Sequence, residues 1–421
     1  MRESWSWGVV MNRCESARSV RHVGCMSAVV GCRSAALAAA MPWVLLVGCA
    51  ASGEPSQGFD NGVDGPGKVD AGSVRLITSD DLQVVVDDRE VGRAYQFLIS
   101  RPGSYRLGGN LAGLAEADCI VVATSNVWLD LNGFSLTGSA GSGHGVRITK
   151  GCRNVRIERG HVRDWGGSGV SGWDGMNCSC TDLTVVDNGG DGVSLGVGGR
   201  VERVQASGNG GDGIRVDAAG MVTDCQAWRN GVGERGGDGI DAGDGAIIRH
   251  CTARDNHGAG FYCGTGAGVR DCVSRANKGI GVRAEPHATL AGLTVTYNDG
   301  DGIVVADGCV VSSCLVSEQE GAGIRVGSFG RISRNHCEGN GRSGEGAGIE
   351  VSGIDNRVSG NDVLLNVRGI VIRDGGNFIS GNLSIHNGEG ESDDYDIVPG
   401  NRVGPIVVAP AESGSPWSNF R

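Results

Sequence analysis

Successive repeats of the chain place charged and phenolic side chains at one recurring position. Each follows a glycine and an apolar residue, in the phrases Gly-Ile-Arg-Val, Gly-Ile-Asp-Ala, Gly-Phe-Tyr-Cys and Gly-Val-Arg-Ala, and the residues are Arg215, Asp241, Tyr262 and Arg283. If the repeats stack in register, these side chains lie about one rung apart on one outward face. A carboxylate between cations, with a tyrosine or arginine able to remove a proton, suits chemistry beside the carboxylate of a sugar acid. The alternative is a solvated ladder of paired opposite charges.

Three aspartates precede the repeated glycine in consecutive repeats, namely Asp191, Asp212 and Asp238. Stacking would bring their carboxylates together, where they could bind calcium through oxygen ligands or raise the pKa of one carboxyl, as in hydrolases with paired carboxylates. The alternative is turn chemistry, in which an aspartate before glycine bonds its own backbone. Calcium is the one cofactor that the sequence suggests, since no cysteine or histidine pair has the spacing of a recognised zinc site.

Two tryptophans, Trp165 and Trp173, are candidates for stacking on sugar rings. Their alternative is ordinary packing. The sequence therefore offers candidates for catalysis, glycan binding and calcium binding, each beside a structural alternative.

These side chains must be positioned by a repeat. Its marker is the glycine that precedes each triplet of an apolar residue, an outward residue and a second apolar residue. Most of its steps are of about 21 residues, and the markers are Gly145, Gly169, Gly192, Gly213, Gly239, Gly260, Gly281, Gly302, Gly323, Gly348 and Gly369. Each unit contains two alternating runs of small or β-branched residues separated by turn residues, and no run has helical periodicity. The pattern predicts an all-β, parallel β-helix (solenoid) of about eleven or more coils, capped at both ends.

Alternation within a strand predicts which side chains line the interior. Ile214 and Val216 share a face, whereas Arg215 points the other way. The second run carries an interior column, formed by Val204, Cys225, Cys251, Cys272, Leu293, Cys314, Asn335, Asn361 and Asn382. Because parallel strands keep neighbouring Cβ atoms nearly a full rung apart, we expect its cysteines to be free thiols. A second set is expected to hold left-handed turns, comprising Asn188, Asn209, Asn256, Asn277, Asn298 and Gln319.

The chain divides into five predicted segments. They are a leader at 1–49, a flexible linker at 50–72, an amino-terminal cap at 73–96, the β-helix at 97–400 and a capping tail at 401–421. The uncharged run before Cys49 is too short to span a membrane. Its ending, Leu-Val-Gly-Cys, resembles the lipobox of bacterial lipoproteins, which implies cleavage before Cys49 and lipid attachment there. Ordinary secretion is the alternative.

The composition of the chain restricts the classes of partner that we expect it to bind. The net charge is −11 and the sequence contains no basic stripe, so we expect no nucleic acid partner. Glycine accounts for 76 of 421 residues, yet 39% of residues are hydrophobic and the glycines follow a period, which indicates a folded repeat. We expect a membrane contact only through the lipid anchor.

Several longer phrases carry a family resemblance. SRPGSYRLGGNL, SNVWLDLNGFSLTG, the NGGDGI repeats and PWSNF resemble the exported right-handed parallel β-helix proteins of bacteria, in the pectate lyase-like superfamily. The resemblance covers roughly residues 97–400 and implies a right-handed coil and association with extracellular polysaccharide. If the protein is an enzyme, it implies a polysaccharide lyase, an epimerase or a glycoside hydrolase. The complete polygalacturonase and pectate lyase motifs are absent, so a non-catalytic surface protein, with the stack as a spacer or adhesin, stays open.

Overall fold

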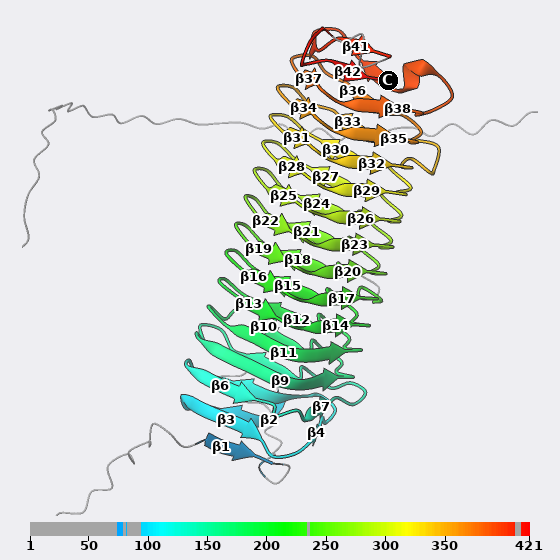
Figure 1. Cartoon of the computed structure of the whole chain (residues 1–421). Coiled ribbons are helices and arrows are strands. Elements are labelled where there is room, and N and C mark those ends of the chain that lie inside the picture. Colours follow the sequence, from blue (N-terminus) through cyan, green and yellow to red (C-terminus); the bar gives the residue numbers. More distant parts are fainter. Residues whose placement is uncertain (1–73, 79–80, 82–93, 234–235, 409–413) are drawn as a thin grey trace, which may run out of the picture. The chain divides into compact units, whose positions relative to one another are not determined.

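Each repeat folds into one coil of three short strands, and successive coils stack in parallel (Figure 1). In one coil these strands are β15 (Ile214–Val216), β16 (Met221–Thr223) and β17 (Gln226–Trp228). The computed structural model describes residues 74–78, 81, 94–233, 236–408 and 414–421, which belong to the unit Lys68–Arg421. The leader at 1–49 with Cys49, the linker at 50–72 and most of the predicted cap lie outside these residues.

The first strand of each coil joins a fourteen-stranded parallel sheet, called sheet 1. Its strands are β2 (Ala94–Ile99), β5 (Ala117–Val122), β8 (Val146–Ile148), β10 (Val170–Gly172), β12 (Val193–Leu195), β15, β18 (Ile240–Ala242), β21 (Phe261–Cys263), β24 (Val282–Ala284), β27 (Ile303–Val305), β30 (Ile324–Val326), β33 (Ile349–Val351), β36 (Ile370–Ile372) and β39 (Tyr395–Ile397).

The second strands form ladder 2. In stacking order they are β1 (Val74–Ile77), β3 (Gly103–Leu107), β6 (Val127–Asp130), β9 (Val155–Arg163), β11 (Ser179–Val186), β13 (Arg200–Glu202), β16, β19 (Ile247–Arg249), β22 (Gly268–Arg270), β25 (Thr289–Ala291), β28 (Val310–Ser312), β31 (Arg331–Ser333), β34 (Arg357–Ser359), β37 (Phe378–Ser380) and β40 (Arg402–Val403).

The third strands form ladder 3, which shares the long strands β9 and β11 with ladder 2. Its other members are β4 (Leu111–Ala112), β7 (Ser135–Thr137), β14 (Gln205–Ser207), β17, β20 (Thr252–Arg254), β23 (Val273–Arg275), β26 (Thr294–Thr296), β29 (Leu315–Ser317), β32 (His336–Glu338), β35 (Asp362–Leu364), β38 (Leu383–Ile385), β42 (Asn419–Phe420) and β41 (Ile406–Val407). The stack has about fifteen coils, in line with the prediction of eleven or more. A short 3-10 turn, η2 (Glu391–Asp393), precedes β39.

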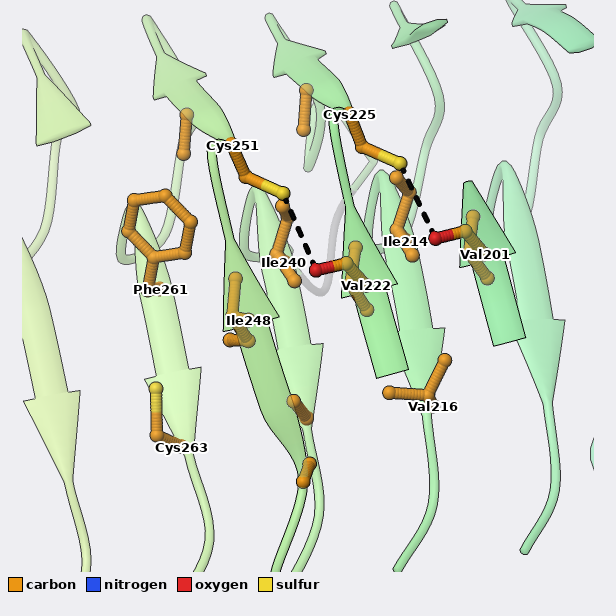
Figure 2. Close-up of a cluster of buried hydrophobic side chains, with 14 of the residues drawn as sticks. Val201, Ile214, Val216, Val222, Cys225, Ile240, Ile248, Cys251, Phe261 and Cys263 are labelled. Atoms are coloured by element: carbon orange, nitrogen blue, oxygen red, sulfur yellow. Dashed lines mark hydrogen bonds between the residues drawn. The ribbon is translucent and has the colours of Figure 1, made fainter. Parts of the chain in front are cut away.

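Side chains from all three strand sets fill the interior of the coil. Ile214 and Val216 are buried while Arg215 faces outward, as alternation predicts. The predicted interior column is also buried, and Figure 2 shows Cys225 and Cys251 on successive coils pointing inward. The thiol of Cys225 donates to the carbonyl of Thr223 at 3.1 Å.

All eleven cysteines among the described residues are buried and free. This agrees with the prediction of free thiols in the interior column. These side chains pack as small apolar groups whose thiols bond backbone carbonyls.

The asparagines expected to hold left-handed turns lie inside the coil instead, so that prediction was wrong. Asn209 is fully buried, and its backbone N and its Nδ2 donate to Oδ1 of Asn230 in the next coil at 3.2 and 2.9 Å. The left-handed backbone belongs to the preceding residue, as in Arg229 with φ of 54°. The ladder of stacked amides comprises Asn188, Asn209, Asn230, Asn256, Asn277, Asn298, Gln319, Asn340, Asn366 and Asn387.

The amide ladder explains the marker glycine. A Cβ on Gly239 would lie 2.6 Å from Nδ2 of Asn256 and 2.7 Å from the carbonyl oxygen of Gly260. A Cβ on Gly213 would likewise clash with Nδ2 of Asn230 and with the carbonyl oxygen of Gly239 in the next coil. These glycines are required because the amide and the neighbouring coil occupy the space of a side chain, not because the backbone is left-handed.

Both ends of the stack extend the ladders. The strand β1 pairs in parallel with β3, so the coils begin within the segment expected to cap them. In the tail, β40 pairs with β37, and Asn382 donates to Oδ1 of Asn419 in β42 at 3.1 Å. The tail thus adds strands to the last coil. No helix among the described residues is long and apolar enough to cross a membrane.

Candidate functional site

The four side chains identified from the repeat lie in register on the outward face of sheet 1. Arg215 pairs with Asp241, Asp241 with Tyr262, and Tyr262 with Arg283, on strands β15, β18, β21 and β24. The sequence-based prediction of one outward column is therefore correct. What that column does depends on the contacts of each member.

Arg215 connects three features of this face. Its Nε lies 3.2 Å from Oδ2 of Asp241, and its guanidinium lies 4.3 Å from the centre of the Trp173 ring. Trp173 is 39% exposed, so it belongs to the surface around the column. Trp165 does not, because it is 1% exposed and its Nε1 donates to the carbonyl of Leu136. The proposal that Trp165 stacks on a sugar was wrong: this tryptophan packs in the core.

Tyr262 keeps its proton more firmly than an ordinary tyrosine. Its hydroxyl donates to Oε1 of Glu285 at 3.1 Å, and burial followed by this hydrogen bond raises the pKa of Tyr262. The Arg283 guanidinium lies 5.9 Å from the tyrosine ring. Tyr262 is therefore protonated at neutral pH, where it has a proton to give but cannot remove one, and it is a weaker acid than an ordinary tyrosine. Sequence reasoning missed Glu285, although it occupies the turn directly after the strand of Arg283.

The three stacked aspartates each bond the backbone of the next coil. Oδ1 of Asp191 accepts from the N–H of Asp212 at 2.9 Å, and Oδ1 of Asp212 accepts from the N–H of Asp238 at 2.7 Å. Asp238 bonds the N–H of Ala259 in the same way. The aspartates therefore have a structural hydrogen bond, but the expectation that each bonds its own backbone was wrong, because each carboxylate bonds the neighbouring coil.

Burial and the repulsion of neighbouring carboxylates raise the pKa of Asp212 and of Asp241 well above the ordinary range of an aspartate. Burial raises the pKa of Asp212 to about 7, and the charges of Asp191, Asp241 and Asp238 add to the effect. Burial also raises the pKa of Asp241 to about 6, against the opposing effect of Arg215. The column and the adjoining turn therefore each contain a carboxyl that titrates near neutrality, Asp241 and Asp212 respectively, as general acids and bases do.

A shallow groove of about 600 Å³ adjoins this column. Its lining is made of small and charged residues, namely Ser168, Gly189, Gly190, Asp191, Gly210, Gly211, Asp212, Arg215, Gly233 and Gly236. Arg215 belongs both to the groove and to the column, so the two form one continuous surface. The glycines leave backbone accessible to a ligand along the floor.

The geometry adds no support for the calcium prediction. One oxygen of each aspartate is committed to a backbone amide. Within the ranges that the structure describes, no group of three or more His, Cys, Asp or Glu side chains is arranged to hold a metal ion.

Farther along the column the charges pair as a structural ladder. Arg325 lies 3.3 Å from both Asp301 and Glu350, and Arg373 lies 3.3 Å from Glu350 and 3.6 Å from Asp396. These pairs match the alternative drawn from the sequence. The candidate site is therefore confined to the coils around Arg215, Asp241 and Tyr262.

A family model described as the right-handed β-helix region matches residues 118–287 and 278–392. The chain belongs to the right-handed β-helix family. The coil is therefore assigned as right-handed. No curated protein matches the chain.

Similar solved structures include the A-modules of two mannuronan C-5 epimerases from Azotobacter vinelandii. The AlgE6 module is 16% identical, with 82% of this chain and 97% of that chain covered and a TM-score of 0.48. The AlgE4 module is 17% identical, with 74% and 91% covered and a TM-score of 0.46. A periplasmic alginate epimerase is 9% identical, with 68% and 83% covered and a TM-score of 0.42. At these values the likeness is one of fold, and activity has to be argued from the residues of this chain.

Proposed function

We propose that the protein binds an extended polysaccharide along the outward face of sheet 1, with the groove beside Arg215 as its centre. The observation that carries the proposal is the continuity of that groove with the column of Asp241 and Tyr262. Carboxylates and guanidinium groups bond sugar hydroxyls and sugar carboxylates, respectively. The glycine floor lets a polymer approach the backbone closely.

The same side chains suit proton transfer at a sugar acid. Asp241, with its pKa raised to about 6, is ionised at neutral pH and basic enough to accept a proton, while Tyr262 carries one to donate. Arg215 and Arg283 are placed to neutralise the carboxylate of the sugar. These roles correspond to epimerisation or β-elimination of a uronate polymer. In an active protein, Tyr262→Phe or Arg283→Ala should abolish turnover, measured as unsaturated uronate by ultraviolet absorbance or as epimer ratio by NMR.

Binding is tested by titrating the protein with polygalacturonate, alginate and a neutral glucan. Arg215→Ala should weaken binding by about tenfold, because a charge-assisted hydrogen bond is lost. Arg325→Ala is the matched control, since Arg325 occupies the same column and makes equivalent ion pairs away from the groove. If wild-type protein binds none of a broad glycan array, the alternative of a non-catalytic spacer or adhesin replaces this proposal.

Export to the cell surface belongs to the same proposal. It is supported by the uncharged run that precedes Cys49 and by the Leu-Val-Gly-Cys ending. A lipid on Cys49 would place the stack outside a bacterial membrane, where polysaccharides are found.

A further inference from the structure

A second groove lies on ladder 2, near the carboxyl-terminal end of the stack. Arg331, Arg357, Phe378 and Arg402 occupy one outward column there, in register on the strands β31, β34, β37 and β40. With Arg334 and Trp417 they define what we call the arginine groove. None of these residues belongs to the face of sheet 1 described above.

The arginine groove is a positively charged surface on an acidic protein, so the expectation that the chain carries no basic stripe was wrong for this face. Arg331, Arg334, Arg357 and Arg402 are all exposed, and no described residue forms an ion pair with any of them. The outward arginines on the strands of sheet 1, by contrast, lie 2.7–3.9 Å from carboxylate oxygens. Like charges on neighbouring rungs repel, and a bound anion would relieve that repulsion. Two hollows belong to the arginine groove, and Asp355 is the one carboxylate among the described residues that line them.

An aromatic corner shapes the groove. The Arg357 guanidinium lies 5.4 Å from the centre of the Phe378 ring, and the Phe378 and Trp417 rings meet edge to face at 6.4 Å. Trp417 is 53% exposed. The two hollows, of about 610 and 450 Å³, share Arg357 and Trp417 as lining residues. The hydroxyls of Ser333 and Ser359 line the smaller hollow.

We propose that the arginine groove binds an acidic polysaccharide through its carboxylate or sulfate groups. Successive rungs lie about 4.8 Å apart, so Arg331 and Arg357 present cations on neighbouring rungs to an extended polymer, and Arg402 presents one two rungs beyond Arg357. Guanidinium groups bond carboxylate or sulfate oxygens in pairs, the exposed Trp417 offers a flat face to a sugar ring, and the serines bond its hydroxyls. A nucleic acid strand is less suited, because binding a strand uses a stacking platform for successive bases and the groove exposes one tryptophan.

The test is direct titration of the full chain with short oligomers of polygalacturonate, of dextran sulfate and of neutral dextran. We expect both anionic probes to bind and neutral dextran not to bind. The double substitution Arg331→Ala and Arg357→Ala should weaken binding at this groove at least about tenfold, and added salt should weaken it further. Trp417→Phe should reduce affinity less, because it keeps an aromatic face.

The matched control is the double substitution Arg249→Ala and Arg270→Ala. These arginines lie on neighbouring rungs of the same ladder, and no aromatic residue lines their hollow. Because each double variant removes two arginines, the change in net charge is identical. Equal losses in both double variants would show a general charge effect and overturn the proposal. Single-stranded DNA binding more tightly than every oligosaccharide would also overturn it. The sheet 1 groove is tested separately by Arg215→Ala, so failure of one site leaves the other unaffected.

Discussion

The amide ladder predicts a large loss of stability when one interior asparagine is truncated. Asn256 is fully buried in the middle of the stack. Its Oδ1 accepts from the backbone N and the Nδ2 of Asn230 at 3.0 and 3.1 Å. Its Nδ2 donates to the carbonyl of Ala227 at 3.1 Å and to Oδ1 of Asn277 at 2.9 Å. The side chain thus uses every donor and acceptor it has.

The substitution Asn256→Ala removes these four bonds and leaves two N–H groups of Asn230 without an acceptor. A buried polar group without a partner costs about 1–3 kcal/mol, so the two donors together cost about 4 kcal/mol. The vacated space adds a cavity term of the same sign. Because coils interact with their neighbours only, we expect the loss to be concentrated in the adjoining coils.

Urea unfolding followed by circular dichroism gives the global effect, and hydrogen exchange on peptides covering 252–277 gives the local one. Asn256→Gln should cost less, since Gln319 already occupies this ladder and bonds the carbonyl of Val295 at 2.8 Å. The exposed control Gln226→Ala should change stability by less than about 0.5 kcal/mol. If Asn256→Ala matches that control in both measurements, water or backbone movement replaces the ladder and the reasoning fails.

Three further predictions concern titration, thiols and export. The pKa of Asp212 is raised from 3.8 to about 7, so the folded state holds a proton that the unfolded state has lost, and stability falls as pH rises through this window. The melting temperature of Asp212→Asn should therefore exceed that of wild type at pH 8 and equal it at pH 4. An equal difference in melting temperature at both pH values would contradict this. Native Cys225, Cys251 and Cys272 should resist thiol reagents until the protein unfolds, whereas peptide mapping that finds a disulfide between any two would refute the ladder. Labelling with a palmitate analogue should be lost in Cys49→Ala, and persistent labelling or a mature start elsewhere would exclude lipid attachment there.

The repeat by itself was sufficient to predict the β-helix and the register of its strands. A period of about 21 residues with alternating apolar positions admits few arrangements, because each outward residue must stack on its counterpart one coil away. The column from Arg215 to Arg283 and the buried cysteines could therefore be predicted from spacing alone. Free thiols followed from the parallel direction of neighbouring side chains.

Local spacing could not show which face of a turn residue is buried. Asn209 has a sequence context typical of a turn, yet it lies inside because the left-handed residue before it turns the chain inward. Trp165 likewise lies in the core, where its Nε1 donates to the carbonyl of Leu136 in a coil formed earlier in the chain. In both cases the environment is supplied by another coil, which the period does not describe.

The surface sites depended most on tertiary structure. Glu285 meets Tyr262 across one coil, and Trp417 reaches Phe378 only because the tail returns to pair with the last strands. The raised pKa of Asp212 arises from burial between coils, which the sequence pattern suggested through stacking but could not quantify. A solenoid sequence determines its own stacking because every coil repeats the same contacts. The grooves beside Arg215 and Trp417 depend on which side chains meet across coils and on where the tail returns, and only the folded chain determines these contacts.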